Sequence, residues 1–127
     1  MYNWVAKHSF DLEERTAKFA ENIILFCKTI PENSITKPII TQLVKSGTSQ
    51  AANYCEACEA ESSRDFIHKI GIVLKETKET KFWLRAISIS HEPCKEKSRN
   101  LWKEANELNL IFAKSRRTAQ SRVSQIK

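Results

Sequence analysis

Two short pairs of cysteine and histidine residues have the spacing of zinc ligands. Cys55 and Cys58 are separated by two residues, and so are His91 and Cys94. A structural zinc ion needs about four such ligands within ~2.3 Å of the metal. On the helices expected below, the two pairs lie roughly 40 Å apart along one helix. The sequence therefore predicts no metal site within one chain and cysteines that pack as small apolar residues. A half-site shared between two subunits is the alternative.

Acid–base catalysis would need a histidine or carboxylate at a defined spacing from a partner. The three histidines are scattered, and no glycine-rich phosphate loop, HExxH or GxSxG motif occurs. Glu56 follows Asn53 by three residues, which places both on one side of a helix. The pair could bond across to Lys75 or Lys78, and we favour this structural polar network over acid–base work. The sequence thus predicts no enzyme, no cofactor and no small-molecule substrate.

Two groups of basic residues could contact phosphates. The first group is a ridge on the expected third helix, within an arc of ~120°, and the second lies near the C-terminus. Residues 114–127 hold five bases and no acid, so most of the net charge of +6 lies there. The groups are Lys75, Lys78, Lys81 and Arg85, and Lys114, Arg116, Arg117 and Arg122. They would suit contacts with RNA or DNA phosphates. The alternatives are a solvated face and a frayed, solubilising end.

Long helices are the elements that must position these residues. The chain of 127 residues has the length of one domain and holds only two glycines and three prolines. Apolar residues recur at steps of four and three in four segments, as on the inner face of a bundle helix. The expected helices span about 10–30, 36–61, 63–90 and 94–114. Residues 1–114 should therefore form one all-α, antiparallel four-helix bundle, followed by a disordered basic tail at 115–127.

Residues that begin or end helices stand near these boundaries. Ser9 is an expected N-cap of the first helix, and Pro31 ends that helix. Ser62 and Asp65 have the spacing of a capping box, with Asp in place of the usual Glu. Pro93 marks the break before the last helix.

Both glycines lie inside expected helices, where each costs ~1 kcal/mol relative to alanine. If the second and third helices form a hairpin, Gly47 lies level with Thr77, and Gly71 lies level with Asn53. We expect these small residues to let the two helices approach closely. Tolerated sequence drift is the alternative.

The third helix carries more apolar surface than one bundle needs. Phe82, Trp83 and Leu84 point in three directions that span ~200°, whereas a bundle helix needs an apolar stripe a little over ~100° wide. Phe82 or Trp83 should therefore be covered by something outside the core, and we predict a subunit interface. The alternative is a tryptophan that lies flat under a long neighbouring side chain.

The sequence favours a cytoplasmic protein. It has neither a signal peptide nor an apolar run of the ~20 residues that span a bilayer. Without export, the four cysteines are expected to be reduced thiols. No membrane partner is predicted.

A set of short motifs carries a family resemblance from Ser9 to Lys114. The motifs are Phe10-Asp11-Leu12, Gln42-Leu43, Ala52-Asn53-Tyr54 with Glu56-Ala57, Ser63, Asp65-Phe66-Ile67, Lys75-Glu76, Glu79 and Phe82-Trp83-Leu84. With them the chain resembles the four-helix-bundle proteins encoded in intervening sequences of bacterial 23S rRNA genes, also called the S23 ribosomal protein family. The family's name reflects where its genes were found and does not establish a ribosomal role.

The resemblance implies a left-handed, up-down-up-down bundle that assembles as a ring-shaped homopentamer. It also implies relatives such as the accessory proteins of diversity-generating retroelements, which are basic pentamers that bind nucleic acid and a reverse transcriptase. This chain departs from them because residues 1–113 are close to neutral. The leading hypothesis is a non-enzymatic homo-oligomer, pentameric by the resemblance and associated with RNA or DNA. The alternative is a protein-interaction scaffold or adaptor with no nucleic-acid role.

Overall fold

The computed structural model describes the backbone of residues 2–126 and the side chains of residues 11–125. Over this range it contains four α-helices, one short 3-10 helix and no strand, which confirms the predicted all-α class. The helices are α1 (Tyr2–Lys28), α2 (Thr36–Cys58), α3 (Ser63–Ser90) and α4 (Lys95–Ile126), and the 3-10 helix η1 (Glu92–Cys94) precedes α4.

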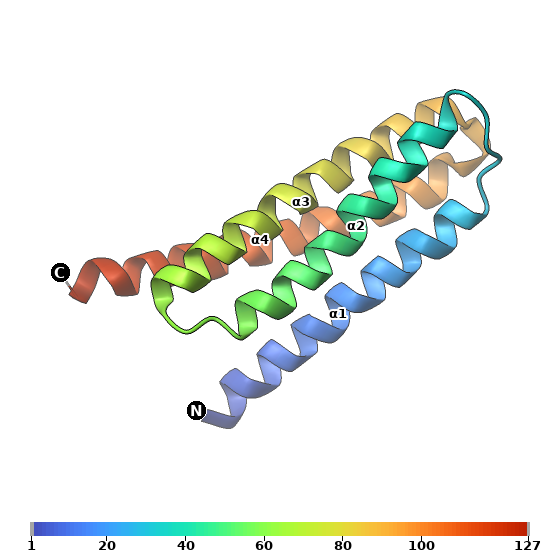
Figure 1. Ribbon diagram of the computed structural model, residues 1–127. Coiled ribbons are helices and arrows are strands. Elements are labelled where there is room, and N and C mark those ends of the chain that lie inside the picture. Colours follow the sequence, from blue (N-terminus) through green and yellow to red (C-terminus); the bar gives the residue numbers. More distant parts are fainter. Residues whose placement is uncertain (1, 127) are drawn as a thin grey trace.

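The four helices lie side by side as a bundle (Figure 1), and the chain turns back at each of the three connections. Helix α3 packs along both α2 and α4, and α1 packs along α2. Helix α1 meets α4 over a much smaller area, which closes the ring of four helices. In the described part of the chain, α1 makes no close backbone approach to α3, nor α2 to α4. Each helix therefore has two neighbours, and the core lies between all four.

The apolar rows predicted from the four-three spacing form this core. Every helix contributes side chains that are at most 5% exposed, among them Phe19, Ile23, Leu43, Tyr54, Ile70, Val73, Leu84, Ile87, Leu108 and Phe112. Burying one such large side chain contributes about 1.5–3 kcal/mol relative to leaving it in water. The rings of Tyr54 and Phe112 join α2 to α4, with 5.3 Å between their centroids.

Side chains at the first two of the three interhelical connections bond to the local backbone. In the α1–α2 turn, Asn33 Oδ1 accepts from the backbone N–H of Thr36 at 2.9 Å, and Thr36 Oγ1 donates to the Pro31 carbonyl at 2.7 Å. In the α2–α3 turn, Ser62 Oγ accepts from the backbone N–H of Asp65 at 3.0 Å. The predicted N-cap at Ser62 is therefore confirmed, and these bonds fix where α2 and α3 begin.

Helix α1 begins earlier than the sequence predicts. It starts at Tyr2, so Ser9 lies inside the helix and is not its N-cap. No glycine or proline occurs between residues 2 and 28 to interrupt it. The side chains of residues 2–10 lie outside the described part of the chain, and the helix ends at Lys28, two residues earlier than predicted.

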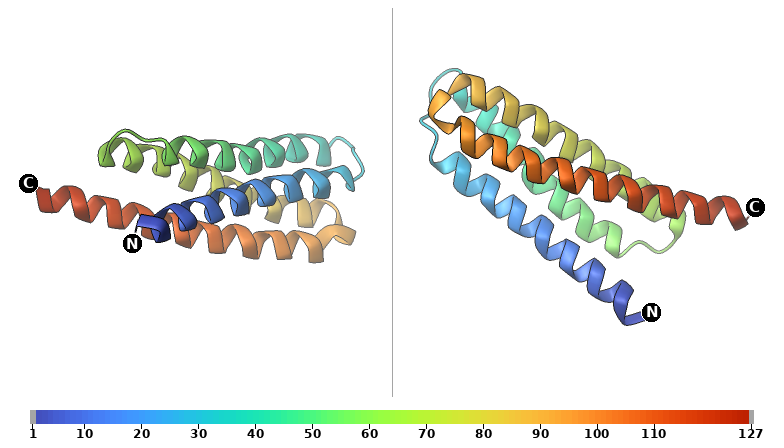
Figure 2. Two further views of the ribbon diagram at one scale, coloured as in Figure 1. Left: turned by 90° about the horizontal axis from the view of Figure 1, so that it is seen from below. Right: turned by 180° about the vertical axis from the view of Figure 1, so that it is seen from behind.

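The prediction of a disordered tail at 115–127 is wrong for residues 115–126, because α4 continues through them. The last turns of α4 extend past the α2–α3 connection (Figures 1 and 2). Ala119 is buried, and Arg116 Nε donates to the carbonyl of Ile67 at 3.3 Å. The contacts of this segment with α3 that the structure shows are made by Arg116, which also lies over Gly71. An apolar periodicity does not reveal a contact made by an arginine.

The two glycines face helices other than the predicted ones. A Cβ atom at Gly47 would lie 3.0 Å from Cγ2 of Ile23 on α1. At Gly71 it would lie 3.0 Å from Nη2 of Arg116 on α4. The predicted pairing of Gly47 with Thr77 and of Gly71 with Asn53 therefore does not explain them. Each glycine instead makes room for one large side chain of a neighbouring helix.

Candidate nucleic-acid interface on helices α3 and α4

A groove lies between α3 and the first turns of α4, and every charged residue that lines it is a cation. The cations are Arg85 from α3 and Lys95, Arg99 and Lys103 from α4. The groove has a volume of about 390 Å³, and Leu84 and Trp102 also line it. Like charges gathered beside apolar walls focus a positive potential that attracts anions. The groove is therefore suited to an anionic ligand.

Helix α4 places its three groove cations one turn apart. Lys95, Arg99 and Lys103 follow at steps of four residues, each with a rise of ~6 Å. Lys114 and Arg117 continue this row, because at ~100° per residue all five fall within an arc of about 100°. All five side chains are exposed. The row spans roughly 33 Å of helix.

A lysine of α3 lies against the tryptophan of the groove. Lys81 Nζ lies 4.8 Å from the ring centroid of Trp102 and donates to Asn106 Oδ1 at 2.8 Å. A cation over an indole ring contributes roughly 0.5–2 kcal/mol. Lys81 thus joins α3 to α4 while its charge stays beside the groove. Below, the basic face means Lys81, Arg85, Lys95, Arg99, Lys103, Lys114 and Arg117.

The predicted α3 ridge is divided between two surroundings. Arg85 lines the groove and Lys81 lies beside its tryptophan, whereas Lys75 and Lys78 are exposed closer to the start of α3. Glu76 is half-buried, and its pKa is raised by burial and by the neighbouring Glu79. Only two of the four predicted ridge residues belong to the basic face.

The predicted basic residues of the C-terminal segment also divide. Lys114 and Arg117 belong to the exposed row on α4, and Arg122 is exposed on another side of the helix. Arg116 is half-buried, since its guanidinium lies over Gly71 and bonds to the α3 backbone. Arg116 therefore has a packing role and does not belong to the basic face.

Sequence reasoning missed the groove cations of α4 and Trp102. Their signal is the spacing of four between Lys95, Arg99 and Lys103, which is visible in the sequence. Their meeting with Lys81 and Arg85 depends on how α3 and α4 align after the η1 turn. That alignment becomes visible only in the fold.

Phe82 and Trp83, the predicted interface residues, differ in burial. Phe82 is 58% exposed, whereas Trp83 is half-buried and packs against the core. Their rings meet edge to face with centroids 4.8 Å apart. Ile89, also on α3, is 85% exposed. One protomer thus leaves Phe82 uncovered, as the interface hypothesis requires.

The predicted polar network at Asn53 and Glu56 does not bridge to α3. Asn53 Nδ2 donates to the carbonyl of Ser49 in its own helix at 2.8 Å, and Glu56 is exposed. Among the described side chains, neither residue bonds to Lys75 or Lys78. The short amide side chain of Asn53 satisfies itself on the backbone one turn earlier.

The cysteines lie in two separate places. Cys27 and Cys94 are buried where the end of α1 approaches the start of α4, and burial raises the pKa of Cys27 to about 11. Cys58 is half-buried, and burial followed by a hydrogen bond with Glu13 raises its pKa to about 12. Cys55 is exposed. No cluster of three or more metal-ligand side chains occurs among the residues the structure describes.

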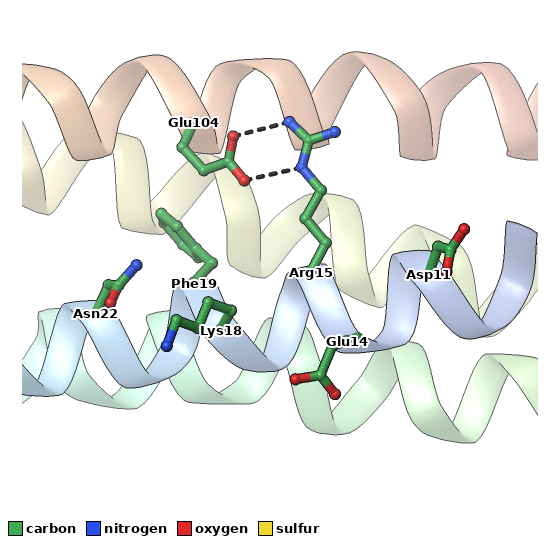
Figure 3. A pocket seen from close by; sticks show the side chains of 7 residues that line it. All are labelled: Asp11, Glu14, Arg15, Lys18, Phe19, Asn22 and Glu104. Carbon is green, nitrogen blue, oxygen red and sulfur yellow. Dashed lines mark hydrogen bonds and ion pairs between the residues drawn. The ribbon is translucent and has the colours of Figure 1, made fainter.

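A second hollow of about 540 Å³ lies between α1 and α4 and contains both charge signs. Figure 3 shows Arg15 of α1 reaching across to Glu104 of α4. The guanidinium donates to both carboxylate oxygens, at 2.9 and 2.8 Å, and also pairs with Glu107 at 3.0 Å. The hydrogen bond to Glu104 is the main cause that raises the pKa of Arg15. The lining sets the carboxylates of Asp11, Glu14 and Glu104 against the cations of Arg15 and Lys18, so the two signs nearly cancel and the hollow offers little net potential for a ligand.

Two comparisons with known proteins each cover most of the chain. Residues 9–114 match the family model described as 23S rRNA-intervening sequence protein. A solved structure from Bacteroides thetaiotaomicron VPI-5482, described as a protein with unknown function from the S23 ribosomal protein family, is 28% identical in sequence. The match has a TM-score of 0.72 and covers 83% of this chain and 97% of that one. No curated protein matches.

No helix of the described chain is long and apolar enough to cross a membrane. The predicted resemblance is confirmed, and the chain belongs to the 23S rRNA-intervening sequence protein family.

Proposed function

We propose that this protein is a non-enzymatic, cytoplasmic homo-oligomer that binds RNA or DNA through its basic face. The observation that carries the proposal is the row of five exposed bases on α4, with Arg85 and Lys81 of α3 beside it. Such a row follows a phosphate backbone without reading its sequence. Of the three acids of α4, Glu104 and Glu107 pair with Arg15 of α1, and Glu96 is exposed at the edge of the row, so the five bases keep a positive excess.

Salt dependence of binding tests this proposal. Binding of a fluorescein-labelled RNA is followed by fluorescence anisotropy at rising salt, for the native chain and for the triple variant Lys95→Gln, Arg99→Gln and Lys103→Gln. Removing three phosphate contacts should lower the slope of log K against log salt by about 2–3 and weaken binding at least ~10-fold.

The control carries the same change in net charge elsewhere. Lys18→Gln, Lys28→Gln and Lys37→Gln alter exposed lysines of α1 and α2 outside the basic face. This variant should keep the native slope to within about one unit. Equal losses in the two triple variants, or binding that ignores salt, would remove the basic face as the binding site.

We further propose a pentamer of left-handed, antiparallel bundles that associate through the outer face of α3. The exposed Phe82 and Ile89 support it, because exposed aromatic and aliphatic side chains on one helix face are typical of interfaces. Native mass spectrometry should report mainly smaller species for Phe82→Ser. Leu25→Ser on α1, where the native side chain is equally exposed at 58%, should leave the stoichiometry unchanged.

The alternative function is a scaffold that binds protein partners without nucleic acid. It is supported by Ile24 and Leu25 on α1, which are exposed apolar residues outside the basic face. A pull-down from the native cells with and without nuclease separates the two functions. Partners that survive nuclease treatment but disappear with Leu25→Ser would favour the scaffold.

A further inference from the structure

We infer that the groove beside Trp102 receives an unpaired base, so that the protein prefers single-stranded RNA or DNA to a duplex. This inference rests on the nucleic-acid function proposed above and deepens it. It starts from a difference between two parts of the basic face. The row of bases on α4 can contact any phosphate backbone, whereas the groove offers a half-open hollow with an aromatic wall.

The size of the groove favours one nucleoside over a double helix. Its volume of about 390 Å³ lies at the lower end of the ~300–1,000 Å³ found for small-ligand sites. A base that is free of its partner can enter such a space. In a duplex the bases are paired and stacked inside, so only the phosphates could reach the rim of the groove.

The chemistry of the lining matches the parts of a nucleotide. Trp102 offers an indole ring for stacking, because its side chain is partly exposed where it lines the groove. Single-strand binding proteins combine such a ring with a positively charged groove that follows the backbone. Here Lys95, Arg99 and Lys103 stand at successive turns of α4 along the groove, so neighbouring phosphates of an extended strand can each meet a cation.

The contacts around Trp102 hold it in place for this role. The Nζ atom of Lys81 lies over its ring, and the bond from Lys81 to Asn106 keeps the lysine there. The ring is half-buried: it packs against the core on one side and also lines the groove. An aromatic ring that is already fixed loses little conformational freedom when a base stacks on it.

Competition between single and double strands tests the inference. The probes are a short unstructured RNA labelled with fluorescein and the same RNA annealed to its complement, at one low salt concentration. The native protein should bind the single strand more tightly. Trp102→Leu should weaken single-strand binding roughly tenfold, as expected for one lost base stack, and change duplex binding less than about twofold. Trp102→Phe, which keeps a ring, should retain most of the preference.

A second variant tests the inference independently, in case Trp102→Leu does not fold. Ser88 also lines the groove, and its hydroxyl bonds only to the Arg85 carbonyl of its own helix at 2.8 Å among the described contacts. Ser88→Leu should fill the groove, keep every charge and again abolish the single-strand preference. Circular dichroism and thermal unfolding report whether each variant is folded. If Trp102→Leu does not fold, the inference is tested with Trp102→Phe and Ser88→Leu instead.

The possible outcomes separate the inference from the proposed function. Equal, salt-sensitive binding of both probes that ignores Trp102→Leu and Ser88→Leu would overturn the inference and leave the basic face as a general phosphate site. Absence of binding to either probe would overturn the proposed function, and the inference with it. A single-strand preference that both variants abolish supports both.

Discussion

The two sides of helix α4 differ in whether their charged residues are paired. Toward α1, the guanidinium of Arg15 is paired with two carboxylates of α4, and the contact is small. Toward α3, packing is extensive, yet four cations surround a groove, and none forms an ion pair with a described residue. Paired charges fix one helix against another. Unpaired cations that lie close together repel one another and slightly destabilise the folded state. A bound anionic ligand would neutralise this repulsion, which is the simplest explanation for why the cations are grouped here.

The largest effect on stability is expected in the core, which lies between both sides of α4. Phe112 is fully buried on α4 and contacts Tyr54 of α2. Phe112→Ala should lower the free energy of unfolding by about 3–5 kcal/mol, measured by urea denaturation. Leu110→Ala, two residues earlier and 62% exposed, should change it by less than about 0.5 kcal/mol. Similar losses in both variants would mean that α4 is rotated from the orientation described.

The buried thiol of Cys27, where the end of α1 approaches the start of α4, should make the stability of the protein fall at alkaline pH. Burial raises the pKa of Cys27 from 9.0 to about 11, so the folded state favours the neutral thiol. This stability is complete below pH 9 and is lost as the pH rises to about 11. Urea unfolding over that range should show a fall of roughly 2 kcal/mol from this thiol alone.

Two cysteine variants isolate the contribution of Cys27. Cys27→Ala removes one of the buried titrating groups and should reduce the alkaline fall by the part that this thiol contributes. Cys55→Ala removes an exposed thiol and should keep the native pH dependence. Cys58, with a pKa of about 12, and Tyr54, whose pKa is raised by burial, act in the same direction and leave a residual slope in both variants. If Cys27→Ala and the native chain share one pH profile, Cys27 is not desolvated in solution.

The fold was predictable where apolar spacing or local capping determines it. The buried rows of all four helices and the N-cap at Ser62 follow from residues at most four apart. The continuation of α4 was not predictable in this way. Its contacts there are a buried alanine and an arginine that reaches residues 45 and 49 positions away, at Gly71 and Ile67.

The candidate site was predictable only in part for a similar reason. Lys81 and Arg85 are recognisable as a basic ridge on one helix. Their proximity to the cations of α4 requires the alignment of two helices across the η1 turn. The pairing of Arg15 with Glu104 likewise joins residues 89 positions apart. Sequence periodicity shows which face of a helix is apolar, but it does not show which charged residues of two helices meet.

The ion pair on the α1 side should have a modest effect. Arg15 and Glu104 are each about one-third exposed, so solvent screens much of their attraction. Glu104→Gln should destabilise the protein by roughly 0.5–1 kcal/mol at low salt, and the difference should shrink in ~1 M salt. Glu96→Gln, an exposed acid in the first turn of α4, should cost less than about half of that. A loss that persists unchanged at high salt would indicate packing rather than charge.

The predicted effects of alanine differ in sign between the two glycines. Replacing a helical glycine with alanine gains up to ~1 kcal/mol from the backbone. At Gly71 the new methyl group meets the end of the flexible Arg116 side chain, which can move away, so Gly71→Ala should stabilise by roughly 0.5 kcal/mol. At Gly47 it meets three carbons of the fully buried Ile23 at 3.0–3.3 Å. Overpacking there costs roughly 1–3 kcal/mol and outweighs the backbone gain, so Gly47→Ala should destabilise. Thermal unfolding measures both variants, and stabilisation by both would show that α1 can move away from α2 as easily as Arg116 moves from α3.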